Sequence, residues 1–133
     1  MKMKETDEGC EKVAVWFRAA KVSEFPQNAG VCVRYNGMQI AVFNFARRNE
    51  WYACQNLCPH KRQMILSRGM IGTAGDEPKV ACPFHKRSYS LRNGECLDGN
   101  GDQISTFPVK VAGDFVYIGI GHDQYAAETQ SMV

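Results

Sequence analysis

Three short turn signatures between strand-like stretches restrict the fold of this chain most strongly. They are Asn36-Gly37, Asn93-Gly94 and Gly113-Asp114. Asn-Gly favours the type I′ hairpin turn, because both central positions of that turn have positive φ. Strands are expected at Val13–Ala19, Val31–Tyr35, Gln39–Phe45, Trp51–Cys54, Val80–Ala81, Ser88–Leu91, Glu95–Leu97, Val109–Val111 and Phe115–Ile120. No heptads, long repeats or long amphipathic helices compete with this pattern. The sequence therefore predicts an all-β fold, a small antiparallel sandwich or barrel.

The length and composition fit one globular domain with two polar ends. The chain has 133 residues, of which 44% are hydrophobic and 23% charged. We expect flexible tails at residues 1–11 and 123–133 and a folded domain over 12–122. No apolar run approaches the ~20 residues of a membrane span. The first eleven residues carry four acidic side chains and no apolar segment, which argues against a signal peptide. A cytoplasmic protein is the expectation.

A long segment rich in glycine, proline and charge interrupts the strand pattern at residues 55–78. Such a segment inside a small β domain is usually functional or disordered, and its Met64-Ile65-Leu66 run favours packing over disorder. Charge also gathers nearby. The stretch 58–92 holds seven basic and two acidic residues, a net +5 in a chain of net +2. This distribution suits docking to an acidic protein surface better than binding to nucleic acid.

Two short loops combine a cysteine, a proline and a histidine. They are Cys58-Pro59-His60 and Cys82-Pro83-Phe84-His85, and each follows a strand-like segment. Proline fixes φ and removes a backbone donor, which helps to hold such a loop in one conformation. With no sign of export, clustered cysteine and histidine indicate metal ligands rather than a disulfide framework.

Two metal chemistries use two cysteines and two histidines. One is tetrahedral zinc, whose paired ligands normally have C-x₂₋₄-C spacing. The other is a Rieske [2Fe–2S] cluster, in which two cysteines hold one iron and two histidines hold the other. The tight C-x-H spacing favours the cluster, because each loop then spans both irons. Zinc stays open as the alternative.

The C-P-H…C-P-F-H pattern resembles the Rieske ferredoxin type over roughly residues 13–121. The resemblance implies a Rieske-type fold with a two-loop cluster-binding subdomain at 55–92. It implies that Cys58 and Cys82 bind the inner iron, and that His60 and His85 bind the outer iron. Tyr89 matches a tyrosine that faces the cluster in this family.

Other positions differ from the high-potential Rieske proteins. Gln63 and Phe84 stand where those proteins have two further cysteines, so their loop disulfide is absent. Arg87 replaces a serine that donates a hydrogen bond to the cluster. Because fewer donors to the cluster sulfurs lower its potential, we expect a low-to-middling value within the Rieske range of about −150 to +300 mV.

A closer resemblance is to the small subunit of assimilatory NAD(P)H-dependent nitrite reductase. It rests on Leu66-Ser67-Arg68-Gly69, on the segment 91–97 (LRNGECL) and on the H-K-R triplet that begins at each motif histidine. It implies electron transfer in the reduction of nitrite to ammonium, in nitrate assimilation. The implied partner is a large subunit with FAD, a [4Fe–4S] cluster and sirohaem. This chain lacks a G-x-G-x-x-G motif, so no substrate site is expected on it.

Two other functions remain open from sequence. One is a free-standing ferredoxin for a ring-hydroxylating oxygenase, and the other is a cluster-free structural subunit. In the main interpretation, four basic residues beside the histidines dock the acidic partner: Lys61, Arg62, Lys86 and Arg87.

Several further residues are expected to have structural roles. Cys32 and Cys54 are interpreted as buried small hydrophobic residues, and His122 as a non-ligand. Met64 and Ile65 are expected to form an apolar lid over the cluster. Gly69 and Gly72 are expected to let the loop turn near the cluster. Cys10 and Cys96 are interpreted as non-ligands.

Overall fold

The computed structural model describes residues 4–5, 13–59, 62–83, 87–98 and 103–121. These residues form mainly antiparallel β-structure, so the all-β prediction is confirmed. Two 3₁₀ turns interrupt it, η2 (Val22–Glu24) and η3 (Leu66–Arg68). None of the described helices is long and apolar enough to cross a membrane. Most of the two predicted tails lies outside the described residues.

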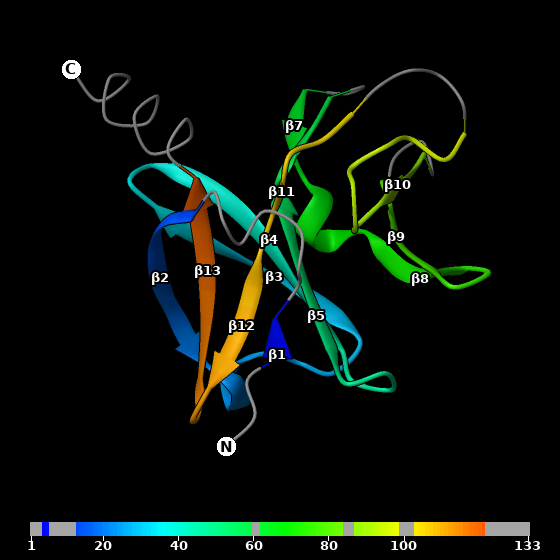
Figure 1. The fold of residues 1–133 in the computed structure, drawn as a ribbon. Coiled ribbons are helices and arrows are strands. Elements are labelled where there is room, and N and C mark those ends of the chain that lie inside the picture. Colours follow the sequence, from blue (N-terminus) through cyan, green and yellow to red (C-terminus); the bar gives the residue numbers. More distant parts are fainter. Residues whose placement is uncertain (1–3, 6–12, 60–61, 84–86, 99–102, 122–133) are drawn as a thin grey trace.

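Two four-stranded sheets form a sandwich (Figure 1). The outer sheet has the order β1-β12-β13-β2, from β1 (Lys4–Glu5), β12 (Val109–Ala112), β13 (Phe115–Gly121) and β2 (Val13–Lys21). The central sheet has the order β11-β5-β4-β3, from β11 (Thr106–Phe107), β5 (Glu50–Gln55), β4 (Met38–Phe45) and β3 (Ala29–Tyr35). All their pairings are antiparallel.

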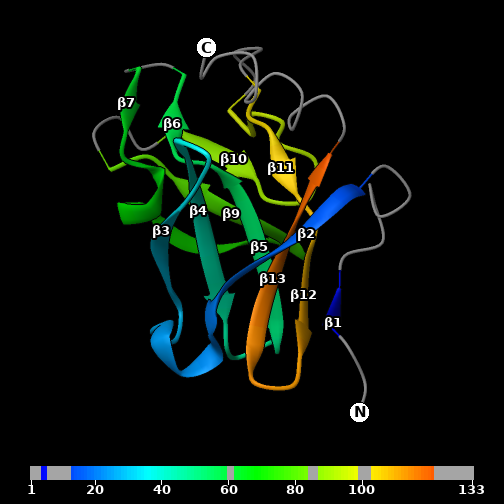
Figure 2. The same cartoon turned by 90° about the vertical axis from the view of Figure 1, so that its left-hand side faces the viewer.

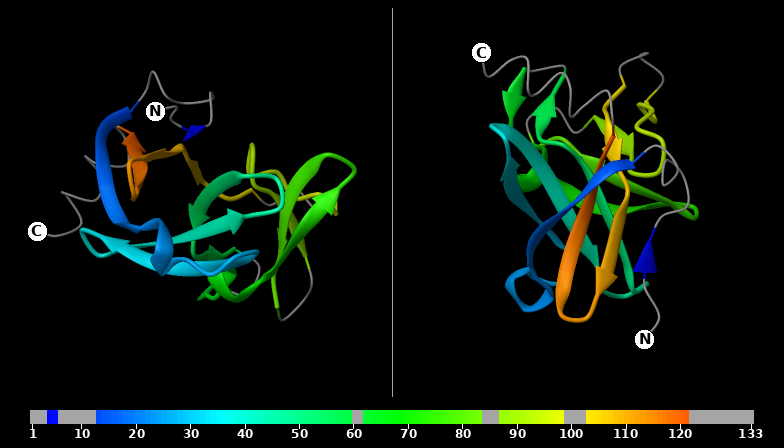
Figure 3. Two further views of the ribbon diagram at one scale, coloured as in Figure 1. Left: turned by 90° about the horizontal axis from the view of Figure 1, so that it is seen from below. Right: turned by 60° about the vertical axis from the view of Figure 1, so that its left-hand side comes forward.

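A third layer packs on the other side of the central sheet (Figures 1 and 3). Its sheet has the order β10-β9-β8, from β10 (Ser88–Ser90), β9 (Glu77–Ala81) and β8 (Met70–Ala74). A two-stranded hairpin stands beside it, formed by β6 (Leu57–Cys58) and β7 (Gln63–Met64). Figure 2 shows this hairpin at the end of the central sheet, near the turn between β3 and β4. We call this third layer, with its hairpin, the subdomain.

Strand β4 is buried on both faces because it lies between two hydrophobic cores. Ile40 and Val42 pack in the sandwich core, against side chains of β13 such as Ile118. Ala41 and Phe43 point the opposite way, into the core shared with the subdomain. A strand covered on both faces needs a continuous apolar run rather than alternation, which explains the segment 40–43 (IAVF).

Two of the three predicted hairpin turns, Asn36-Gly37 and Gly113-Asp114, join strands that pair with each other. Asn36 and Gly37 have φ of 50° and 84°, as a type I′ turn requires. Gly113 at the β12–β13 turn has φ of 63°.

Two predictions along the chain are incomplete. The stretch 55–78, expected to be irregular, contains β6, β7, η3 and β8. Strands of two residues are too short to show a period-2 pattern, and Gly72 weakens the strand signal of β8. The strand expected at Glu95–Leu97 is reduced to two isolated bridges, Tyr89 with Cys96 and Glu95 with Gln103.

Candidate metal centre

The structure brings the two motif cysteines into one apolar core. Cys58 is the last residue of β6, and Cys82 directly follows β9. They are 0% and 1% exposed and belong to the same hydrophobic cluster, which we call the subdomain core. Neither takes part in a disulfide. Two thiols that are outside any disulfide and buried in one cluster fit the sulfur half of a metal site.

The first motif occupies the loop of the β6–β7 hairpin. Cys58 pairs with Gln63, and the backbone N–H of Arg62 donates to the Cys58 carbonyl at 2.6 Å. Arg62 has φ of 56°, a left-handed conformation that is uncommon for a residue with a side chain. The loop is therefore tightly closed around residues 59–61. His60 and Lys61 lie outside the described residues.

The second motif occupies the loop between β9 and β10. The Cys82 N–H donates to the Arg87 carbonyl at 2.8 Å, next to the pair of Ala81 with Ser88. Ser88 is fixed further by Asp98, whose carboxylate accepts its N–H at 2.8 Å. His85 and Lys86 lie outside the described residues. Each cysteine thus stands at the base of a loop that backbone hydrogen bonds close.

Tyr89 lies in the same core as both cysteines and is fully buried. It sits in the middle of β10, paired with Val80 of β9. This position agrees with the tyrosine expected beside a cluster. Its role toward the cluster stays a prediction.

The Rieske-like [2Fe-2S] domain matches residues 15–119, which include both loops and nearly all described strands. The chain belongs to this family. The donor set fits the family's cofactor, because two buried thiols and two loop histidines are the ligands of a Rieske cluster.

The relatives of this Rieske-like domain point to two kinds of redox system. The chain is 38% identical over 104 residues to a nitrite reductase NAD(P)H large subunit of Klebsiella oxytoca, and the match covers 78% of this chain and 11% of that protein. The chain thus spans only about a tenth of that relative. It is 31% identical to the ferredoxin subunit of a 3-phenylpropionate/cinnamic acid dioxygenase of Photorhabdus laumondii, covering 77% of this chain and 92% of that protein.

A solved structure of similar size supports the fold. The nitrite reductase NAD(P)H small subunit of Erwinia carotovora is 29% identical, with a TM-score of 0.68. The match covers 80% of this chain and 82% of that chain. The Rieske-type fold with its two-loop subdomain is therefore confirmed.

Asn56 anchors the first ligand loop of this Rieske-like domain. Its side chain is 2% exposed, and its Oδ1 accepts the Ser67 N–H at 2.7 Å. Its carbonyl accepts the N–H groups of Ile65 and Leu66 at 2.9 and 3.0 Å. Its Nδ2 donates to Gln39 Oε1 at 2.9 Å, on β4. Asn56 therefore gathers both ends of the loop that carries Cys58 and ties them to the central sheet.

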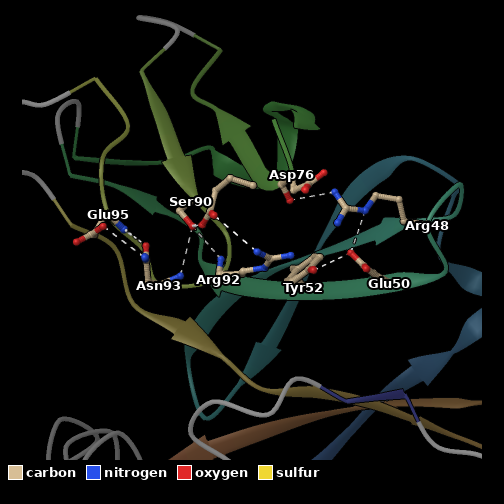
Figure 4. Close-up of polar contacts among 9 residues, drawn as sticks. Arg48, Glu50, Tyr52, Asp76, Ser90, Arg92, Asn93 and Glu95 are labelled. Atoms are coloured by element: carbon tan, nitrogen blue, oxygen red, sulfur yellow. Dashed lines mark hydrogen bonds and ion pairs between the residues drawn. The ribbon is translucent and has the colours of Figure 1, made fainter. Parts of the chain in front are cut away.

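A polar network joins the subdomain to the central sheet (Figure 4). Ser90 donates its hydroxyl to Glu77 and accepts the N–H groups of Arg92 and Asn93 at 3.2 and 3.4 Å. The Arg92 guanidinium lies 3.7 Å from the Glu77 carboxylate. This half of the network fixes the turn that follows β10.

The other half of the network belongs to β5 and the turn before it. Tyr52 donates to Glu50 at 2.8 Å, and Arg48 pairs with Glu50 at 3.3 Å. Arg48 also donates to the Asp76 carbonyl at 3.3 Å, which ties the β4–β5 turn to the β8–β9 turn. Burial, followed by the hydrogen bond to Glu50, raises the pKa of Tyr52.

Sequence reasoning missed Asn56 and this network. Asparagine and charged residues in loops have no local spacing that distinguishes a buried anchor from a solvated side chain. A signal for Asn56 was its place two residues before the motif cysteine Cys58.

The predictions for two other cysteines, Cys54 and Cys32, have different outcomes. Cys54 is fully buried, as expected, and burial raises the pKa of its thiol far above the ordinary value. A thiol held neutral in this way suits packing rather than metal binding. The prediction that Cys32 is buried is wrong, because β3 is an edge strand and Cys32 is exposed there.

Of the two residues expected to form an apolar lid, only Ile65 packs on the core. Ile65 packs against the subdomain core, whereas Met64 is 49% exposed. Met64 therefore does not cover the core within the described structure. His122, interpreted as a non-ligand, lies outside the described residues.

Proposed function

We propose that this chain is the electron-transfer small subunit of an NAD(P)H-dependent nitrite reductase, an oxidoreductase that reduces nitrite to ammonium. The observation that carries the proposal is the pair of buried thiols at the bases of two closed loops, in a Rieske-like domain. The similarity to a nitrite reductase small subunit along most of both chains supports this choice of enzyme.

In this proposal Cys58 and Cys82 hold the inner iron of a [2Fe–2S] cluster, and His60 and His85 hold the outer iron. When bound, the cluster accepts and donates one electron at a time. The chain's own residues exclude water from the thiolates, since the subdomain core surrounds both cysteines. The loop-closing hydrogen bonds at Cys58 and Cys82 fix the base of each loop.

The proposed partner is a large subunit that carries FAD, a [4Fe–4S] cluster and sirohaem. Nitrite chemistry then takes place on that subunit, and this chain contributes no substrate site. Arg62 and Arg87 close the two loops through their backbones and so stand at the loop bases, where positive side chains attract an acidic surface. Lys61 and Lys86 complete the proposed docking set. We place the complex in the cytoplasm, where thiols stay reduced.

The second candidate function is a ferredoxin for a ring-hydroxylating oxygenase. The likeness to a dioxygenase ferredoxin subunit along most of both chains favours it. Purification of the native protein from its cell separates the two functions. A sirohaem flavoprotein in a stable complex supports the reductase, and an oxygenase client with no such complex supports the ferredoxin.

The central experiment measures iron, acid-labile sulfide and zinc in the purified chain, with an EPR spectrum after dithionite reduction. We expect two irons, two sulfides and a rhombic signal of Rieske type. Zinc, or no metal after anaerobic reconstitution, would leave a structural subunit instead. His85→Cys should alter or abolish the Rieske spectrum, and His122→Ala should leave it unchanged. A spectrum lost in His122→Ala would show that the ligand set is wrong.

A further inference from the structure

The return segment of the first loop is η3 followed by Gly69, and it leads to the strand that pairs with β9, the strand before the second loop. Asn56 holds its first residues, as described above. Leu66 inserts its side chain into the subdomain core beside both cysteines. Gly69 N–H closes η3 by donating to the Leu66 carbonyl at 2.9 Å. The segment is therefore tied firmly to the half of the centre that carries Cys58.

Gly69 contacts the other half of the centre through backbone. A Cβ on Gly69 would lie 2.4 Å from the Ala81 carbonyl oxygen and 2.8 Å from Val80 Cγ2. Ala81 directly precedes Cys82 and pairs with Met70, the residue after Gly69. A side chain at position 69 would therefore press on the peptide that carries Cys82.

The need for glycine at position 69 is one of space. Its φ of −73° and ψ of 166° are extended values that any residue adopts. The obstacle is a carbonyl within a paired strand, which cannot rotate away as a flexible side chain could. Something in the backbone must shift if a Cβ is added, since real contacts are never this short.

We propose that Gly69 is a positioning residue for the metal centre, setting the separation between the Cys58 loop and the Cys82 loop. The proposal rests on the proposed function, in which both thiolates bind one iron. The Cys82 N–H is bonded to the Arg87 carbonyl, so a push on Ala81 displaces the second loop as a unit. The first loop stays held by Asn56, and the spacing of the ligands changes.

Two glycines provide matched controls. Gly72 lies in β8, three residues further on, and a Cβ there meets nothing within 4 Å. Gly119 lies in β13 of the outer sheet, and a Cβ there would lie 2.8 Å from Val13 Cγ2. Gly72→Ala therefore reports the effect of an added methyl in open space. Gly119→Ala reports crowding away from the subdomain core.

The experiment compares Gly69→Ala with both controls by EPR g values, reduction potential and loss of visible absorption in a chelator. We expect Gly69→Ala to shift the g values and the potential and to lose its cluster about tenfold faster than the wild type, a typical cost of disturbing a ligand's support. Gly119→Ala should lower the unfolding midpoint and keep the wild-type spectrum. Gly72→Ala should match the wild type in both. Equal spectra and equal loss rates in Gly69→Ala and Gly119→Ala would overturn the proposal.

A second measurement uses the iron-free protein and does not depend on the cluster. Gly69→Ala should move the amide NMR resonances of Ala81 and Cys82, whereas Gly72→Ala should leave Cys82 in place. Unmoved resonances in Gly69→Ala would contradict the positioning role. If the wild type binds no iron, the proposed function fails, and this comparison alone decides whether Gly69 positions the second loop.

If Gly69→Ala does not fold, Asn56→Ala tests the same spacing from the other side. It releases Ser67 from the first loop and leaves Gly69 unchanged. We expect shifted g values in this variant as well. A wild-type spectrum in a destabilised Asn56→Ala protein would count against the proposal.

Discussion

Ser67 donates its backbone N–H to the side-chain oxygen of Asn56 at 2.7 Å, across the loop that carries Cys58. Asn56 is buried and also donates to Gln39 on β4, so its side chain links η3 to the central sheet. The hydrogen bonds of this one side chain hold the first loop against the central sheet.

Replacement of Asn56 should therefore be costly. Asn56→Ala leaves the Ser67 N–H without its acceptor and removes the donor from Asn56 Nδ2 to Gln39 Oε1, and we expect a loss of about 1–3 kcal/mol in unfolding free energy. Urea denaturation of the iron-free protein measures it. The exposed Gln103, which donates one 3.3 Å hydrogen bond, gives a control: Gln103→Ala should change stability by less than about 0.5 kcal/mol. Equal losses in the two variants would refute the anchoring role.

Stability at high pH should depend on Tyr52. Burial and the Glu50 hydrogen bond raise its pKa, so the folded state holds the phenolic proton more tightly than the unfolded state does. This contribution is complete below a tyrosine's ordinary value of about 10 and is lost as the pH rises through the higher folded value. Urea unfolding between pH 8 and about 11 should show a steeper decline for the wild type than for Tyr52→Phe.

Glu50→Gln provides the control for this pH effect. The amide still accepts a hydrogen bond from Tyr52 but carries no charge, so the raised pKa of Tyr52 should fall and the decline should become shallower. Identical slopes in the wild type and Tyr52→Phe would show that another group causes the decline.

Gly94 and Gly113 form a matched pair for testing backbone crowding. Both have positive φ, 81° and 63°, so alanine is strained at either position by about 1 kcal/mol. At Gly94, however, a Cβ would lie 1.9 Å from the Ile104 carbonyl oxygen, whereas at Gly113 it meets nothing within 4 Å. Gly94→Ala should therefore lower the unfolding midpoint well beyond Gly113→Ala. Similar midpoints would mean that the Ile104 segment moves aside freely.

Cysteine substitutions should separate ligand from packing roles. Cys58→Ala should abolish iron binding, because it removes one of the two buried thiols of the loops. Cys54→Ala should keep the iron and cost about 1 kcal/mol from the lost core volume. Iron analysis and urea denaturation of both variants give the answer. Loss of iron in Cys54→Ala with the fold intact would require a different ligand set.

The docking proposal predicts a charge effect at Arg62. Arg62→Glu should slow association with the large subunit and reduce its dependence on ionic strength, because steering by a positive loop base is lost. Arg47→Glu makes the same charge change in the exposed β4–β5 turn, at the opposite end of β4 from the first loop, and should bind like the wild type. Surface plasmon resonance at two salt concentrations measures both. Equal effects would indicate net charge rather than a docking site.

The sequence predicts the parts of this domain that local chemistry encodes. Asn36-Gly37 marks its hairpin because positive φ favours these residues, and the C-x-H and C-x-x-H spacings mark the two loops. Asn56 and the Glu77–Ser90 contact were not predicted, since they join residues far apart in sequence. The special role of Gly69 was also hidden: its backbone is ordinary, and only the fold shows what stands beside it.

Strand β4 has no solvent face, and this arrangement has a consequence for how the molecule responds to its cofactor. Ala41 and Phe43 pack in the subdomain core, which would hold the cluster. Their neighbours Ile40 and Val42 pack in the sandwich core on the other face of the strand. If the subdomain tightens when it binds the cluster, hydrogen exchange should therefore slow in β13, which lies beyond the central sheet from Cys58 and Cys82. Slower exchange in β13 would show that the sandwich and the subdomain unfold as one cooperative unit, rather than as two independent parts.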